Sequence, residues 1–133
     1  MAGKWRLTVD EAFCASHQLR NYNGKCEHLH GHNFGVTVEV EGCELDPAVE
    51  ILVDFGELKR LTREAVGALD HSHLNDLPAF AEHNPSSENL ARHLYLEIRD
   101  RLVVAAPHAR LVSVSVSEKG SSRATYLEDD LEA

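Results

Sequence analysis

The chain has few cysteines and no excess of basic residues, and each shortage excludes a class of protein. Three cysteines, Cys14, Cys26 and Cys43, are an odd and small number, which argues against a framework built on disulfides. Thirteen Lys and Arg against 22 Asp and Glu give a formal net charge of −9. Because such a balance offers no general attraction to a phosphate backbone or an anionic lipid surface, we expect neither nucleic acid nor a membrane as a partner.

Long apolar runs and linker segments are also missing from the sequence. No run approaches the roughly 20 apolar residues of a membrane span, and residues 1–6 lack the apolar region of a signal peptide, so we expect a cytoplasmic protein. No repeat or Pro/Gly-rich stretch divides the 133 residues, which predicts a single domain over residues 1–133. Histidine, in contrast, is abundant: there are nine, against one Met and one Trp.

Three segments alternate apolar and polar residues with the period of a strand that has one buried face. The first begins at Trp5 and has apolar residues at odd positions, with Glu11 alone out of pattern; the second, 34–40, has them at even positions. The third spans 112–116, and a short hairpin partner is expected near 124–127. These segments predict four strands.

Two amphipathic helices are predicted between the second and third strands. Asp54 and Glu57 have the spacing of a capping box, so the first helix is expected from about 55 to 69, and Asn84-Pro85-Ser86-Ser87 opens a second helix that ends before Pro107. The order strand, strand, helix, helix, strand, strand predicts an α+β fold with a four-stranded antiparallel sheet and both helices on one face. Its two open edges favour self-association.

The apolar rows of three strands end in polar residues, which suggests a polar pocket at one end of the sheet. Continued with the same parity, the rows reach His17, then His32 and His30, and finally Glu118, although a bulge near Glu11 would turn His17 away. His30 and His32 would lie about 6 to 7 Å apart along one strand face, within reach of one ion. An H-x-H pair by itself fits ordinary hydrogen-bonded histidines equally well. The shared parity with His17 favours a three-nitrogen zinc site with an open position.

Three further residues could carry acid–base chemistry. Cys26 lies beside Lys25, which would favour its thiolate, although an inert loop thiol is the commoner case. Asp70 directly precedes His71, and a carboxylate can orient an imidazole for proton transfer, but neighbours in sequence need not touch. The remaining histidines receive no role: His28, His73, His83, His93 and His108.

These residues together resemble the 6-pyruvoyl-tetrahydropterin synthase / 6-carboxytetrahydropterin synthase family. Six matching pieces follow the family's order over almost the whole chain: residues 13–17, 26–32, 54–55, 69–75 and 84–88, and Glu118. The resemblance implies a tunnelling fold (T-fold), in which sheets from several subunits join into a barrel and active sites form between subunits. It also implies a homo-oligomer, a hexamer made of two trimers.

The resemblance gives each candidate residue a role. It implies these assignments: His17, His30 and His32 as zinc ligands, Cys26 as the catalytic base, Asp70 and His71 as a proton-relay pair, and Glu118 as the anchor of a pterin's amino-pyrimidine edge. Such an anchor is physically reasonable because a carboxylate can accept two parallel hydrogen bonds. Cys14 and Ser16 stand where the family more often has Ser and Ala, and neither departure affects an assigned position.

The three residues between Cys26 and His30 resemble the bacterial, carboxy-forming branch of the family. That branch is a zinc-dependent lyase, which converts 7,8-dihydroneopterin triphosphate to 6-carboxytetrahydropterin, acetaldehyde and triphosphate on the route to queuosine. Three alternatives stay open: the pyruvoyl-forming reaction or another pterin side-chain cleavage, a structural or metal-binding zinc protein, and a metal-dependent hydrolase or lyase on another small β fold. Lys25, Arg20 and Lys119 are equal candidates for binding the triphosphate.

Overall fold

The computed structural model describes residues 3–22 and 29–129, which form one sheet covered by two helices. Strands β1 (Trp5–His17) and β2 (His30–Gly42) pair antiparallel, and β2 also pairs antiparallel with β4 (Arg110–Lys119), next to β5 (Ser122–Tyr126). The α+β class and the order of these elements confirm the prediction.

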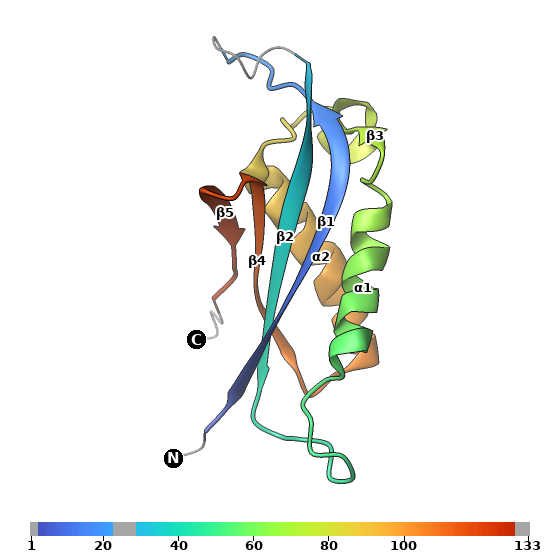
Figure 1. The fold of residues 1–133 in the computed structure, drawn as a ribbon, viewed down its shortest axis with the longest axis vertical. Coiled ribbons are helices and arrows are strands. Elements are labelled where there is room, and N and C mark those ends of the chain that lie inside the picture. Colours follow the sequence, from blue (N-terminus) through green and yellow to red (C-terminus); the bar gives the residue numbers. More distant parts are fainter. Residues whose placement is uncertain (1–2, 23–28, 130–133) are drawn as a thin grey trace.

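Helices α1 (Phe55–Gly67) and α2 (Ser87–Ala105) pack against the same face of the sheet (Figure 1). Asp54 caps α1 by accepting hydrogen bonds from two backbone N–H groups of its first turn, and Ser86 caps α2 by accepting one from Asn89. Cap residues satisfy N–H groups that have no partner inside the helix. Within the described residues, neither helix combines the length and the apolar character needed to cross a membrane.

The sheet has five strands, so the prediction of four purely antiparallel strands was wrong in this detail. Strand β3 (Ser72–His73) pairs in parallel with β1 opposite Ala15 and Ser16, and the strand order is β3-β1-β2-β4-β5. A strand of two residues is too short to show a period in the sequence. Only tertiary pairing with β1 reveals it.

The pairing of β1 with β2 decides which way the histidines face. The register is uninterrupted along both strands and ends with His17 opposite His30. Glu11 causes no bulge in this described pairing; its carboxylate instead lies 3.0 Å from the guanidinium of Arg63 on α1. His17 therefore stays on the buried face, next to the stacked rings of Phe13 and Phe34.

Strand β4 departs from simple alternation near its start. Its register with β2 shifts between Glu39 and Val40, so Leu111 rather than Val112 lies opposite Val40. Leu111 belongs to the hydrophobic core together with Val114, and this part of the core begins one residue earlier than the pattern predicts. A bulge of this kind inserts one residue and inverts the alternation on one side of it.

Candidate metal centre

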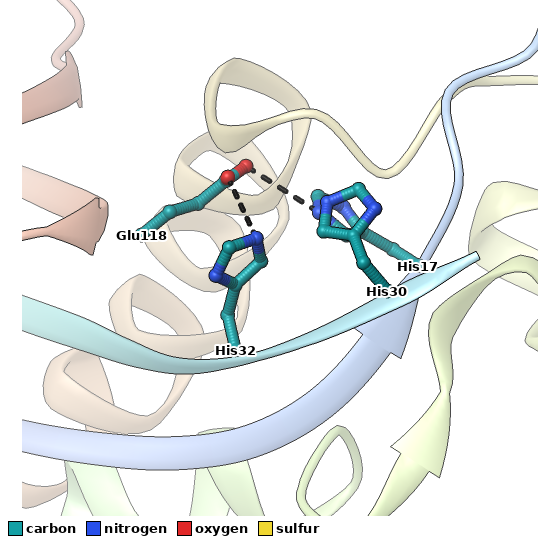
Figure 2. Close-up of side chains that lie close together, drawn as sticks. All are labelled: His17, His30, His32 and Glu118. Carbon is teal, nitrogen blue, oxygen red and sulfur yellow. Dashed lines mark ion pairs between the residues drawn. The ribbon is translucent and has the colours of Figure 1, made fainter. Parts of the chain in front are cut away.

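Three histidines and one glutamate converge where the apolar rows of β1, β2 and β4 end (Figure 2). His17 is the last residue of β1, His30 and His32 open β2, and Glu118 lies near the end of β4. One potential ligand atom from each of the four lies within 4.8 Å of the others. This group, here called the histidine cluster, can hold a single metal ion.

His17 is the most constrained member of the cluster. It is fully buried, and its Nδ1 lies 2.7 Å from the carbonyl oxygen of Pro85. Since a carbonyl only accepts hydrogen bonds, Nδ1 must carry the proton, and the lone pair is left on Nε2. Holding one ring nitrogen by a carbonyl is how proteins orient metal-binding histidines.

The Nε2 atom of His17 fits a bound cation. Among the described residues it is a buried nitrogen with no hydrogen-bond partner, and it lies 3.4 Å from Oε2 of Glu118. Buried polar atoms are almost always satisfied, so an exception with a lone pair aimed at other ligands indicates a metal-binding atom. The donor set of imidazole nitrogens and a carboxylate suits zinc and similar divalent ions.

The three imidazoles are held close together but are not stacked. The ring centroids of His17 lie 4.5 Å from His30 and 5.6 Å from His32, and His30 and His32 are 4.7 Å apart, all in edge-on arrangements. Burial lowers the pKa of His17 below its ordinary value of 6.5, against the hydrogen bond to Pro85 and the charge of Glu118, which raise it. A lowered pKa favours the neutral imidazole, which is the form that binds metal.

Glu118 lies inside the histidine cluster, as the polar pocket predicted from the strand rows led us to expect. Its parity correctly placed it on the face of His17 and His32, but its expected contact was a pterin. In the structure Oε1 lies 3.1 Å from Nε2 of His32, and Oε2 faces His17 (Figure 2). The signal was present in the shared parity, whereas the direction of a long side chain depends on tertiary contacts.

Asp70 and His71 contact each other, at the edge of β1. The Asp70 carboxylate lies 3.4 Å from Nε2 of His71 and also accepts a hydrogen bond from the backbone N–H of Cys14 at 2.8 Å. His71 adopts a left-handed φ of 57°, a conformation that costs a non-glycine residue about 1 kcal/mol, and its N–H donates to the carbonyl of Cys14. The imidazole is 79% exposed, so it can meet a group from outside this chain.

Among the described residues, Arg20 makes hydrogen bonds to the backbone of a loop and not to the histidine cluster. Its guanidinium donates to three backbone carbonyls, those of Asn75, Phe80 and His83. These three of the five guanidinium N–H groups are not available to a phosphate group, which makes Arg20 a weaker candidate for triphosphate binding than a cation without partners. Cys26, Lys25 and His28 lie outside the described residues, and the role of Cys26 stays a prediction.

Three of the unassigned histidines have structural contacts. Nδ1 of His73 is 2.9 Å from the hydroxyl of Ser16, and Nε2 of His108 is 2.6 Å from the carbonyl oxygen of Leu52. His93 packs against a phenylalanine ring, and its burial lowers its pKa below 6.5. These contacts explain the three residues as parts of the fold.

Comparison with known proteins decides the family. The family model described as 6-pyruvoyl tetrahydropterin synthase matches residues 6–129, nearly the whole chain. The chain belongs to this family. Membership agrees with the histidine cluster, since the motifs that carried the resemblance supply all four of its residues.

Relatives in the family carry two different names. The chain is 33% identical to human 6-pyruvoyl tetrahydrobiopterin synthase, with 86% of each chain covered, and 32% identical to 6-carboxy-5,6,7,8-tetrahydropterin synthase of Synechocystis, with 92% of each covered. The solved structure of Caenorhabditis elegans 6-pyruvoyl tetrahydropterin synthase superposes with a TM-score of 0.83 at 25% identity, covering 96% of this chain and 98% of that one. The T-fold is thereby confirmed.

Proposed function

We propose that the protein is a zinc-dependent 6-carboxy-5,6,7,8-tetrahydropterin synthase. It converts 7,8-dihydroneopterin triphosphate and one water molecule to 6-carboxytetrahydropterin, acetaldehyde and triphosphate, on the route to queuosine and other deazapurines, as a cytoplasmic homo-oligomer. The observation that carries the proposal is the histidine cluster, found in a chain of this family. The spacing of Cys26 and His30 and the name of the Synechocystis relative support the carboxy-forming branch.

In this proposal His17, His30 and His32 hold the zinc ion through ring nitrogens. The buried lone pair on Nε2 of His17 and the hydrogen bond from its Nδ1 to Pro85 support this assignment. When bound, zinc supplies a Lewis acid that acidifies the hydroxyl groups of the substrate side chain.

Proton transfer is assigned to Cys26, Asp70 and His71. Cys26 removes a proton from the substrate side chain, and His71, oriented by Asp70, returns or relays one, so that isomerisation, loss of triphosphate and carbon–carbon cleavage follow. The contact between Asp70 and His71 supports their pairing. Their exposed position at the edge of β1 suits an active site completed by a neighbouring subunit, as the family resemblance implies.

Glu118 has a second task in this proposal, since it anchors the pterin ring. A carboxylate that accepts two parallel N–H groups would hold the ring in register for the proton transfers. In the structure the same carboxylate contacts His17 and His32. The anchoring role therefore requires the Glu118 side chain to turn away from the cluster when substrate enters.

Product analysis tests the proposal directly. The zinc-loaded protein is incubated with 7,8-dihydroneopterin triphosphate, and acetaldehyde and a 6-carboxypterin are expected in equal amounts. His30→Ala serves as the inactive control. Absence of any turnover would overturn the proposal, and wild-type turnover by zinc-loaded Cys26→Ala would show that the role given to Cys26 is wrong.

The second candidate is the pyruvoyl-forming reaction, which eliminates triphosphate and keeps the side-chain carbons. The human relative and the superposed structure from Caenorhabditis elegans both bear that name. The same incubation distinguishes the two activities, because the pyruvoyl-forming reaction releases no acetaldehyde. A structural zinc protein, with Glu118 closing the coordination shell, would turn over no pterin at all.

A further inference from the structure

Most basic side chains in the described part of the chain already have partners. They pair with carboxylates or donate to carbonyl and amide oxygens, as Arg63 does to Glu11 and Arg20 does to Phe80. Within residues 3–22 and 29–129, three basic side chains are exposed and make no hydrogen bond or ion pair: Lys59, Lys119 and Arg123. In a chain with a net charge of −9, such unpaired cations identify where an anion can bind.

Two of these three cations line one groove. Lys119 and Arg123 lie on the β4–β5 hairpin, and the groove is completed by Glu118 and by Ser87 and Glu88 in the first turn of α2. Lys119 pairs with Ser122 across the hairpin, and this pairing holds the two cations on one short turn. Lys59 lies elsewhere, on α1.

The two carboxylates of the groove leave Lys119 and Arg123 available. Glu118 directs its carboxylate at His17 and His32 in this structure (Figure 2). In the proposed function it pairs with the N–H groups of the pterin ring when substrate enters, so in neither state is its charge paired with the two cations. Glu88 lies in the first turn of α2, where the partial positive charge of the helix end stabilises a carboxylate. The two cations can therefore donate several charge-assisted hydrogen bonds to a polyanion.

The chemistry of the proposed substrate places its phosphates near this groove. The triphosphate is carried by the same side chain whose hydroxyl groups would be bound at the histidine cluster, so the phosphates must lie within a few bonds of that cluster. Glu118 belongs to both the cluster and the groove, which makes the two sites adjacent.

We infer that Lys119 and Arg123 bind the triphosphate of the substrate. The inference rests on the proposed function and extends it, because it selects Lys119 over Arg20 and adds Arg123, a residue to which the sequence gave no role. It also explains how an acidic chain binds a polyanion: of the three unpaired cations in the described residues, two lie together beside the histidine cluster.

The test compares a phosphorylated with an unphosphorylated pterin. We would measure KM and kcat for 7,8-dihydroneopterin triphosphate in three variants: Lys119→Ala, Arg123→Ala and the double variant. The same variants are tested for inhibition by 7,8-dihydroneopterin, which has no phosphate. Lys59→Ala is the matched control, since it removes another unpaired, exposed cation. All variants are checked for an unchanged unfolding temperature.

Each single variant is expected to raise KM about tenfold and the double variant about a hundredfold, with kcat nearly unchanged. The inhibition constant of 7,8-dihydroneopterin should stay at the wild-type value, and added salt should reduce the difference in KM because exposed charges are screened. Wild-type KM in both single variants, or an equal rise in Lys59→Ala, would overturn the inference and leave the proposed function intact. If the wild-type protein turns over no triphosphate, the proposed function itself fails, and the inference with it.

Discussion

The two ends of strands β1 and β2 each hold a cluster of polar side chains, and the clusters differ in how well those side chains are satisfied. At one end lies Glu41, which is 7% exposed. Its carboxylate oxygens are 2.9 to 3.5 Å from basic nitrogens of three side chains: Lys4, Arg6 and Arg110. At the other end, Nε2 of His17 is buried without a hydrogen-bond partner among the described residues.

This difference separates a cluster that stabilises the fold from one that is arranged for binding. The ion-pair partners of Glu41 all belong to this chain. Removing the Glu41 carboxylate should therefore lower the stability of the fold and leave metal binding unchanged. A buried polar atom without a hydrogen-bond partner costs about 1 to 3 kcal/mol, so an atom of this kind is more typical of a binding site than of a contact that stabilises the fold. A bound ion would give this nitrogen a partner.

The largest expected effect is the loss of zinc affinity in the His32→Ala variant. Removing one of the three imidazole ligands that we propose should weaken zinc affinity more than about a hundredfold, since even the loss of an outer partner of a ligand costs tenfold to a hundredfold. Titration with zinc against a competing chelator measures the affinity, and Glu41→Ala should bind zinc as the wild type does. Unchanged affinity in His32→Ala would mean that the cluster is not the zinc site.

The next effect is on stability, at the opposite end of the sheet. Glu41→Ala leaves Arg110 and its neighbours without their carboxylate and should lower the free energy of unfolding by about 1.5 kcal/mol. Urea unfolding of the metal-free proteins measures the loss. Glu44→Ala, which removes an exposed carboxylate from the following loop, should change stability by less than about 0.5 kcal/mol. Equal stability of the two variants would contradict a stabilising role for Glu41.

The smallest expected effect is the pH dependence of that loss. Hydrogen bonds from Arg110, and then from Arg6, hold the pKa of Glu41 below its ordinary value of 4.5. The folded chain therefore binds this proton more weakly than the unfolded chain, so the stabilisation is present above pH 4.5 and disappears as pH falls through the lower, folded-state pKa.

Urea unfolding of the wild type and Glu41→Gln across this range measures the effect. The wild type should be about 1 kcal/mol more stable near pH 7, and the difference should shrink below the ordinary pKa of a glutamate. A difference that stays constant down to pH 3 would show that the ion pairs around Glu41 are not its source.

Much of the candidate site could be predicted because strand alternation is a local property. Side chains along a strand alternate between its two faces, so the apolar residues at every second position were enough to place His17, His30 and His32 on the buried face. The uninterrupted register of β1 with β2 keeps these side chains on that face. The cap at Asp54 was predictable for the same reason, since it involves backbone groups only two and three residues away.

The errors arose where distant segments meet. Strand β3 exists only because β1 pairs with it, and the shift that brings Leu111 opposite Val40 depends on how β4 meets β2. The contacts of Arg20 with carbonyls some 60 residues away were equally invisible, although the residue itself was considered.

The sequence by itself therefore determined the order of the main elements, the shared face of the three histidines and the family, because each follows from local periodicity or from collinear motifs. Tertiary structure alone decided which atoms act together. It places the carbonyl of Pro85 on His17, 68 residues away, turns Glu118 into the cluster and leaves Lys119 and Arg123 unpaired beside it. The physical reason is that a side chain's partners are set by packing between segments, which no spacing along the chain encodes.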